Sequence, residues 1–183
     1  MNLIETFQNL VAQVPELVQP LIVALAGAVP FIEGEGAATI GILGGIPPVV
    51  AAIAAMTGNF VCVALLVLAS SRAREAVVNR QRAKALVDAD GRVVGAPPAK
   101  SMPVEENARK AARKQKFQRA LDRYGVPGVS LLGPLLLPTQ FTATMLAAIG
   151  VSKARVLIWQ SVAIIGWTTG LSLLASGIVH FAA

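Results

Sequence analysis

The spacing of apolar residues divides the first part of the chain into an amphipathic helix and a series of apolar segments. In residues 1–14 the apolar positions recur three and four residues apart, which predicts an amphipathic helix. Two short apolar segments follow, at 16–29 and 37–45, separated by a break rich in glycine and proline. Because a membrane-crossing helix needs about 20 residues, these segments predict a hairpin over about 16–45 that does not cross. Residues 48–71 are long enough and predict the first spanning helix.

The second part of the chain repeats this order of elements. Residues 104–123 predict a second amphipathic helix, whose basic face is either simply solvated or adheres to anionic lipids. Residues 125–151 carry no charge and are broken near the middle by Pro134 and Pro138. This broken segment is either a re-entrant hairpin or a single kinked spanning helix. Residues 156–180 predict the second spanning helix.

The composition is typical of a membrane protein. Of 183 residues, 55% are hydrophobic and 14% are charged, whereas charged residues make up about a quarter of a usual soluble domain. All 16 Lys and Arg residues lie between Arg72 and Arg155. The positive-inside rule produces this distribution. The net charge of +6 therefore indicates cytoplasmic segments of a multi-pass protein in the cell membrane, and argues against nucleic-acid binding.

The same charge distribution predicts the topology. Residues 72–103 form the predicted basic cytoplasmic linker, whose first part, from Arg72 to Lys84, is expected to continue the spanning helix. Lys153 and Arg155 place the turn before the last helix on the same side. Both flanks of the broken segment are then cytoplasmic, which favours the re-entrant hairpin. A unit of amphipathic helix, hairpin and spanning helix occurs in residues 1–71 and again, inverted, in 104–183, as in many transporters. The predicted fold class is an all-α integral membrane protein with two inverted repeats, and with both chain termini outside.

Two carboxylates interrupt the apolar background. Glu33 and Glu35 are the only charged residues over 17–69, and they lie in the break PFIEGEG that starts at Pro30. Acidic side chains at membrane depth are costly and usually face a cavity or a polar pathway. The alternative is a short loop outside the membrane, with both carboxylates in water. Aligning the two halves of the chain at Pro30 and Pro134 makes the break a hairpin tip, which favours the embedded position.

The two predicted tips supply binding groups of different kinds. Neither hairpin contains Lys or Arg, so a proton or a cation is the cheapest way to neutralise carboxylates shielded from water. The second tip adds hydroxyl and amide groups. The predicted proton- and substrate-binding residues are Glu33, Glu35, Thr139, Gln140 and Thr142. The predicted backbone breaks at the hairpin tips are Pro30, Gly34, Gly36, Pro134 and Pro138. The alternative role is structural: a protonated carboxyl bonded to the opposite tip would hold the hairpins together.

No cofactor, metal centre or catalytic group is predicted. The single cysteine, Cys62, lies in an apolar run, which excludes an intrachain disulfide and argues against a metal cluster. His180 lies at the far end of the last apolar segment, where an interfacial position is the simplest interpretation. Neither residue has an acidic neighbour, and no plausible Ser/His/Asp set is present, so the sequence argues against an enzyme.

Several short motifs resemble the small multidrug export protein family, a distant relative of the DedA/VTT membrane proteins. In the first half these motifs are Pro30-Phe31-Ile32-Glu33, Gly41-Ile42 through Gly45-Ile46, and Gly58-Asn59. In the second half they are Tyr124-Gly125-Val126, Pro134 with Pro138-Thr139, Ala147 to Val151, and Gly166-Trp167. The resemblance covers most of residues 25–170. It implies a first tip with an acidic residue, here Glu33, followed by a basic one, where this chain has Glu35. DedA proteins similarly carry arginine at the second tip, where this chain has Thr139 and Gln140.

The predicted function is proton-coupled export of a small cationic or amphiphilic molecule. A lipid translocase for a polyprenyl phosphate or a phospholipid is the alternative that the DedA resemblance implies, and a non-transporting membrane scaffold is the second alternative. Glu33 is predicted to be the more important carboxylate because it matches the acidic position of the family. The predicted partners are protons, the substrate, and a bilayer with an anionic cytoplasmic leaflet. The oligomeric state, including a homo-oligomer, stays open.

Overall fold

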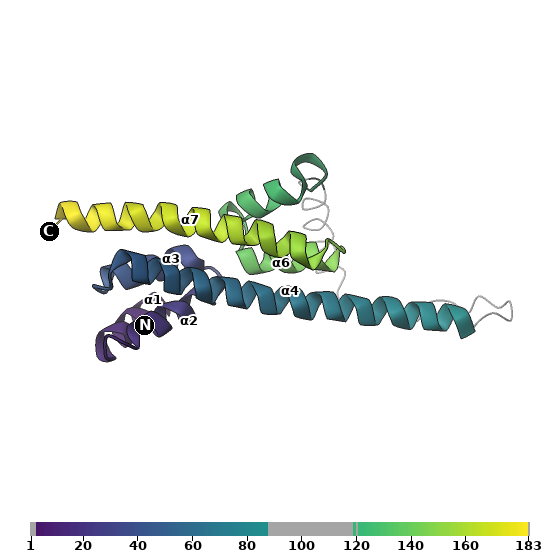
Figure 1. The fold of residues 1–183 in the computed structure, drawn as a ribbon, viewed down its shortest axis with the longest axis horizontal. Helices are drawn as coiled ribbons and strands as arrows, with labels where there is room; N and C mark the ends of the chain where they lie inside the picture. The colour runs from purple at the N-terminus through teal and green to yellow at the C-terminus, as the bar shows by residue number, and fades with distance from the viewer. Residues whose placement is uncertain (1–2, 88–118, 120, 183) are drawn as a thin grey trace, which may run out of the picture.

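The computed structural model describes residues 3–87, 119 and 121–182, which form helices joined by short turns, with no strand among them (Figure 1). The first half contains α1 (Leu3–Gln13), α2 (Gln19–Gly27), α3 (Glu33–Leu43) and the long helix α4 (Pro48–Val87). In the second half residues 121–132 are helical, followed by the 3-10 turn η1 (Gly133–Leu135), α6 (Thr139–Ala148) and α7 (Lys153–Ala182). Short helices therefore precede each of the two long helices.

The two long helices, α4 and α7, run antiparallel and are both long and apolar enough to cross a membrane (Figure 1). Their apolar spans, Pro48–Arg80 and Lys153–Phe181, contain 33 and 29 residues, and about 20 suffice to cross a bilayer. Only 28% and 22% of the most apolar window of each span is buried inside the protein. The core helix of a soluble protein would be mostly buried, so these outward apolar faces fit a lipid surrounding.

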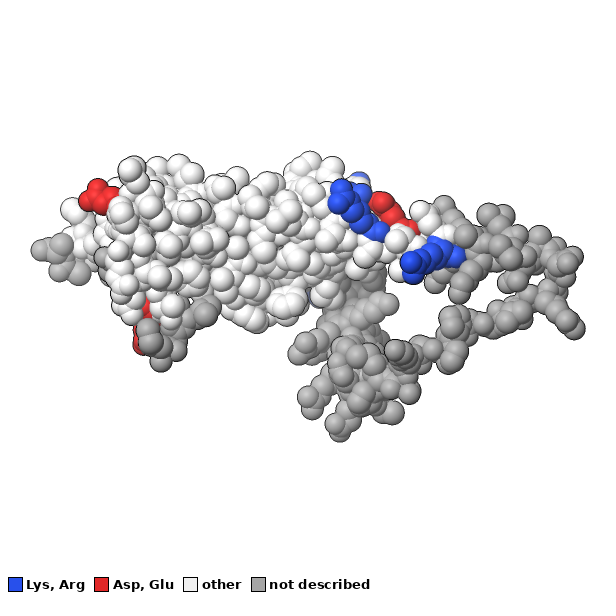
Figure 2. All heavy atoms as spheres, turned by 90° about the horizontal axis from the view of Figure 1, so that it is seen from below, with Lys and Arg blue, Asp and Glu red and all other residues white. Residues whose placement is uncertain are grey.

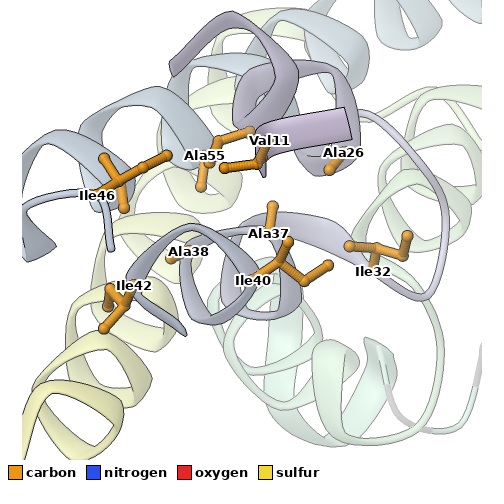
Figure 3. Close-up of a cluster of buried hydrophobic side chains, with 11 residues drawn as sticks. Val11, Ala26, Ile32, Ala37, Ala38, Ile40, Ile42, Ile46 and Ala55 are labelled. Atoms are coloured by element: carbon orange, nitrogen blue, oxygen red, sulfur yellow. The ribbon is translucent and has the colours of Figure 1, made fainter. Parts of the chain in front are cut away.

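The short helices of the first half pack against one end of α4. The contact is a cluster of small and branched side chains that includes Val11, Ala26, Ala37, Ile40 and Ala55 (Figure 3). Helices α2 and α4 cross very closely, because a Cβ atom on Gly58 would stand 1.8 Å from the carbonyl oxygen of Ala24. Close crossings at small residues are the usual way that helices associate within a membrane.

The helices of the second half pack against α7 and the middle of α4. A second cluster joins them, formed by Val63, Val67, Val129, Ala143, Leu146, Ala147, Val156 and Ile164. The indole N–H of Trp167 in α7 donates a hydrogen bond of 2.9 Å to the carbonyl of Leu131. The predicted break is present, because η1 and the extended residue Pro138 (ψ 141°) separate residues 121–132 from α6.

The exposed charges lie toward the two ends of the molecule. Figure 2 shows Lys and Arg side chains gathered at the end where α4 extends beyond α7, with a long uncharged region beside them. At this basic end, Lys153 of α7 forms an ion pair of 2.9 Å with Glu75 of α4. Both chain ends lie toward the opposite end (Figure 1).

The structure confirms the helical class and both long helices. It extends α4 to Val87, so the first part of the predicted linker 72–103 is a continuation of the long helix. The remainder of that linker, and most of the predicted basic helix 104–123, lie outside the described residues. Gly34 and Gly36 were predicted as part of a broken tip, but they lie in the first turn of α3, and the loop is confined to the residues before Glu33.

Candidate functional site

The turns between the short helices meet each other through Glu33 and Thr139. One carboxylate oxygen of Glu33 accepts the backbone N–H of Thr139, and the other accepts its hydroxyl, both at 2.5 Å. Each residue is the first of its helix, Glu33 in α3 and Thr139 in α6. The unpaired N–H groups at a helix N-terminus attract a negative charge. The carboxylate of Glu33 therefore caps α6, a helix more than a hundred residues away, and joins the two turns, as the structural alternative for this carboxyl group required.

The turn before α3 holds an unusual backbone conformation. Phe31 and Glu33 both have positive φ angles, 72° and 53°. Residues other than glycine rarely adopt this region, and they persist there only where the surrounding structure imposes it, often at functional sites. The conformation turns the Phe31 ring outward, where it is 82% exposed, and leaves the Glu33 side chain buried. The outward ring packs against Phe141 of α6, with 6.3 Å between ring centroids.

The start of α3 also lies directly against α7. A Cβ atom on Gly34 would stand 2.3 Å from the hydroxyl oxygen of Thr168, so only glycine fits at this contact without movement. Thr168 is fully buried and lies near the middle of α7. Gly34 thus has a packing role rather than the tip role that the sequence predicts.

A second polar pair lies beside the tips, on α4. The side-chain amide nitrogen of Gln140 donates a hydrogen bond of 3.2 Å to the side-chain oxygen Oδ1 of Asn59. Asn59 lies 11 residues after Pro48 and 12 before Ser71, the ends of the charge-free part of α4. At 1.5 Å per residue, it is about 17 Å from either end. The meeting point of the tips is therefore level with the middle of the apolar part of α4 and close to the middle of α7.

A hollow of about 420 Å³ opens between the two tips. Its lining consists of both carboxylates within a mostly apolar wall: Phe31, Ile32, Glu33, Glu35, Gly36, Pro134, Leu135, Leu136, Leu137, Pro138, Trp167 and Leu171. A second hollow of about 280 Å³ adjoins it and shares Glu35. Cavities of this size and apolar character, with a few convergent polar groups, are typical binding sites for small molecules.

The two carboxylates differ in their surroundings. Glu33 is 6% exposed, and both of its oxygens are bonded to Thr139. Glu35 is half-buried and lines both hollows, and no other described residue donates a hydrogen bond to its side chain. Within the described structure neither carboxylate forms an ion pair. Of the two carboxylates in the hollow, Glu35 is therefore the one whose oxygens are not already bonded to Thr139.

The remaining predicted site residues fall into two groups. Pro134 and Pro138 line the hollow and shape the second tip, while Pro30 forms part of the loop of the first. Gln140 lies in the buried pair with Asn59 and not in the wall of the hollow. The hydroxyl of Thr142 points back toward the Pro138 carbonyl of its own helix, at 3.5 Å.

The sequence analysis named Asn59 and Trp167 only as parts of motifs, and it gave no place in the site to the polar residues inside the long helices. Asn59, Gln160 and Thr168 are fully buried. Trp167 lines the hollow and donates a hydrogen bond to the carbonyl oxygen of Leu131. An uncharged polar side chain in the middle of an apolar helix is itself a signal, because such groups face the protein interior within a membrane. That signal could have identified Asn59 and Thr168.

The described residues contain no group of three or more His, Cys, Asp and Glu side chains that could hold a metal ion. The arrangement defines a class of helical protein with two long apolar helices, in which a hollow containing two carboxylates opens beside one of them, α7, where the short helices turn. Comparisons with protein families, characterised proteins and solved structures find no match.

Proposed function

We propose that this protein is a proton-coupled transporter that exports a small cationic or amphiphilic molecule across the cell membrane. One observation carries the proposal: two carboxylates, with no basic partner among the described residues, lie in a mostly apolar hollow, level with the middle of two long apolar helices. An apolar wall holds a hydrophobic body, and a carboxylate in that wall selects a positive charge.

The proposal includes re-entrant hairpins. Helices α2, α3 and α6 contain 9, 11 and 10 residues, and about 20 are needed to cross. Their turns nevertheless lie beside the middle of α4 and α7. With the basic end on the cytoplasmic side, each pair of short helices enters and leaves on one side, and the two halves of the chain are inverted repeats.

In the proposed mechanism one carboxylate carries either a proton or the substrate. A cationic molecule entering the hollow pairs with ionised Glu35, and a proton on Glu35 removes the charge that holds it. Because the two ligands compete for one group, a proton gradient can drive the cation in the opposite direction. Glu33 has a different role, since its hydrogen bonds to Thr139 hold the turn before α3 against the start of α6.

This assignment revises the expectation from the family position, which favoured Glu33. Replacing Glu33 by glutamine preserves the geometry of its two hydrogen bonds to Thr139, because the amide oxygen still accepts the Thr139 N–H and the amide nitrogen donates to the hydroxyl. The hollow contains two carboxylates, and Glu33 is already hydrogen-bonded to Thr139. Replacing Glu35 by glutamine removes the other one.

The test uses purified protein in liposomes, with a pH-sensitive dye inside and ethidium as the cationic probe. We expect Glu35→Gln to lower ethidium–proton exchange by about tenfold or more, because one charge pair in a shielded site is worth at least 1.4 kcal/mol. Glu33→Gln should retain most of the exchange, as should the surface control Glu16→Gln. Exchange lost in Glu33→Gln and kept in Glu35→Gln would restore the family-based assignment. Exchange unchanged in both variants would rule out the antiport mechanism.

A lipid translocase is the second candidate, because the hollow is open at its side. Phe31 and Leu136 line it and are 82% and 85% exposed, so an acyl chain could remain outside while a headgroup enters. An anionic headgroup, however, would need the N-terminus of α6, and Glu33 already occupies that position. Scrambling of a fluorescent phospholipid by the same liposomes, without ethidium exchange, would favour the translocase.

A further inference from the structure

A buried glutamine lies between the tips and the basic end of the molecule. Gln160 in α7 is fully buried, and neither its amide nitrogen nor its amide oxygen has a hydrogen-bond partner within the described structure. Ser130, also fully buried, has an unpartnered hydroxyl too. Serine can bond to the backbone of its own helix, but the long amide of glutamine has no such outlet. Gln160 is therefore the polar group that most requires an explanation.

Both residues belong to the packed region where the second-half helices meet α4 and α7. Gln160 lies one helical turn from Val156 and one turn from Ile164, and both of these are members of the second apolar cluster. Ser130 follows Val129 of the same cluster. Along α7, Gln160 stands 7 residues from Lys153 and 8 from Thr168. At 1.5 Å per residue it is about 11 Å from the basic end and about 12 Å from the level of the tips.

The pair of amides beside the tips is also incompletely bonded. Asn59 and Gln140 share one hydrogen bond, but the amide nitrogen of Asn59 and the amide oxygen of Gln140 have no partner in the described structure. These residues lie one turn from Val63 and Ala143, which belong to the same cluster as Val156 and Ile164, the residues one turn on either side of Gln160. Unpartnered donors and acceptors thus occur from the level of Glu33 to about two turns from the basic end.

Buried donors and acceptors of this kind are almost always satisfied, and water is the usual partner where protein groups are missing. We propose that Gln160 and Ser130 form a buried water site that connects the carboxylates of the tips to the cytoplasmic end. Its ligand is ordered water, which carries protons between bulk solvent and the hollow. The amides do not exchange the proton themselves; they hold the water in place. This inference rests on the proposed proton coupling, but the hydration itself can be measured without transport.

The first test measures hydration in nanodiscs, where both membrane faces are accessible and no transport is needed. Gln160→Cys and Ser130→Cys are introduced separately in a Cys62→Ala background and treated with silver ion, the smallest thiol reagent. The matched control is Val156→Cys, which is fully buried and one turn nearer the basic end. We expect cysteine at 160 to react about tenfold faster than cysteine at 156, although it lies deeper. Equal, slow reaction at 130, 156 and 160 would overturn the water site.

The second test connects the site to proton movement. In liposomes, Gln160→Leu should slow proton uptake about tenfold, while equilibrium binding of ethidium at fixed pH stays at the wild-type level. Ser161→Ala is the control, because its hydroxyl bonds only to the Leu157 carbonyl of its own helix. Unchanged proton uptake in Gln160→Leu would overturn the connection. Failure of the proposed function gives a different result, in which the wild-type protein itself moves no protons while cysteine at 160 still reacts quickly.

Discussion

The bond between Glu33 and Thr139 can exist with or without a proton on the carboxyl group. The Thr139 N–H only donates, but the hydroxyl can donate to a carboxylate or accept from a carboxylic acid. Adding a proton therefore reverses one hydrogen bond and breaks neither. A group with this property is well suited to hold two turns together. This is the structural role that was the alternative to proton and substrate binding. Such a group is less suited to release a substrate at every cycle, and this is the reason for assigning that task to Glu35.

At the same scale, the hydroxyl of Thr139 should contribute measurably to stability. Thr139→Val removes the bond to one carboxylate oxygen of Glu33, and hydrogen bonds to charged groups are worth about 2 kcal/mol. We expect the free energy of unfolding in detergent micelles to fall by about this amount, while Thr139→Ser, which keeps the hydroxyl, stays close to wild type. Thr144→Val is the control, because that hydroxyl bonds only to carbonyls of its own helix. A loss of unfolding free energy in Thr144→Val equal to that in Thr139→Val would contradict a stabilising hydrogen bond between Thr139 and Glu33.

Gly34 gives a second prediction at the residue scale. In Gly34→Ala the new Cβ atom meets the hydroxyl of Thr168 at 2.3 Å, and overpacking of this kind costs about 1–3 kcal/mol. Thr168→Ala removes the atom that is struck, so the double variant should recover most of the loss. The control is Gly166→Ala, where no atom lies within 4 Å of the new Cβ. Thermal unfolding of the wild type, the two single variants and the double variant measures the coupling between the two positions. If the stability losses of the two single variants simply add in the double variant, the contact is refuted.

At the scale of elements, the fold depends on how closely α2 approaches α4. Two glycines line this crossing: a Cβ atom on Gly27 would stand 2.6 Å from the Ala55 carbonyl oxygen, and one on Gly58 would stand 1.8 Å from that of Ala24. Both obstacles are backbone atoms, so no side chain can rotate away. The crossing holds α2 against α4, and α3 follows α2 after the short loop that ends before Glu33.

Gly58→Ala should therefore displace a whole helix. We expect a loss of stability of about 3 kcal/mol or more, together with weaker ethidium binding, because α3 and Glu35 move with α2. Gly170→Ala in α7 is the matched control, since it also places a Cβ in a long apolar helix but meets no atom within 4 Å. Wild-type stability in Gly58→Ala would show that α2 does not lie as close to α4 as the structure places it.

At the scale of the whole molecule, the basic end and the two chain ends lie at opposite ends of the long helices (Figures 1 and 2). This separation agrees with the topology expected from charge, in which residues 72–124 and 152–155 are cytoplasmic and both termini are outside. The ion pair of Lys153 with Glu75 is exposed and contributes at most about 1 kcal/mol. This pair adds little to stability, so the role that we expect of the basic residues is to set the orientation.

Cysteine labelling of intact cells tests the orientation. In a Cys62→Ala background, single cysteines at positions 13 and 183 should react with a membrane-impermeant maleimide, while a cysteine at position 99 should react only after the cells are opened. The chemical reason is that the Lys and Arg residues between 72 and 155 are costly to translocate. Labelling at position 99 from outside intact cells would refute the topology and, with it, the cytoplasmic direction of the proposed water path.

The sequence by itself determined the elements and their order. Apolar periodicity and length are local properties, so α1, α4 and α7 could be predicted, as could the breaks before Glu33 and between residues 132 and 139. A contact of Glu33 or Glu35 with Thr139 or Gln140 could also be predicted, because aligning the two halves placed these residues at turns, but the sequence did not select the pair Glu33 and Thr139. These predictions needed only the spacing of residues along the chain.

Only the tertiary structure decided what each polar group faces. From the sequence, Glu33 and Glu35 are two similar carboxylates of one tip. In the structure both line the hollow, but Glu33 is bonded to Thr139 of α6, whereas Glu35 is not. Gln140 and Thr142 were predicted beside the substrate, yet one bonds to Asn59 and the other points back toward its own helix. Gln160 is a polar residue in an apolar helix, which signals burial, but the sequence does not show which groups its amide faces. Which side of a helix faces a neighbour depends on packing between segments distant in sequence, and residue spacing along one chain does not contain that information.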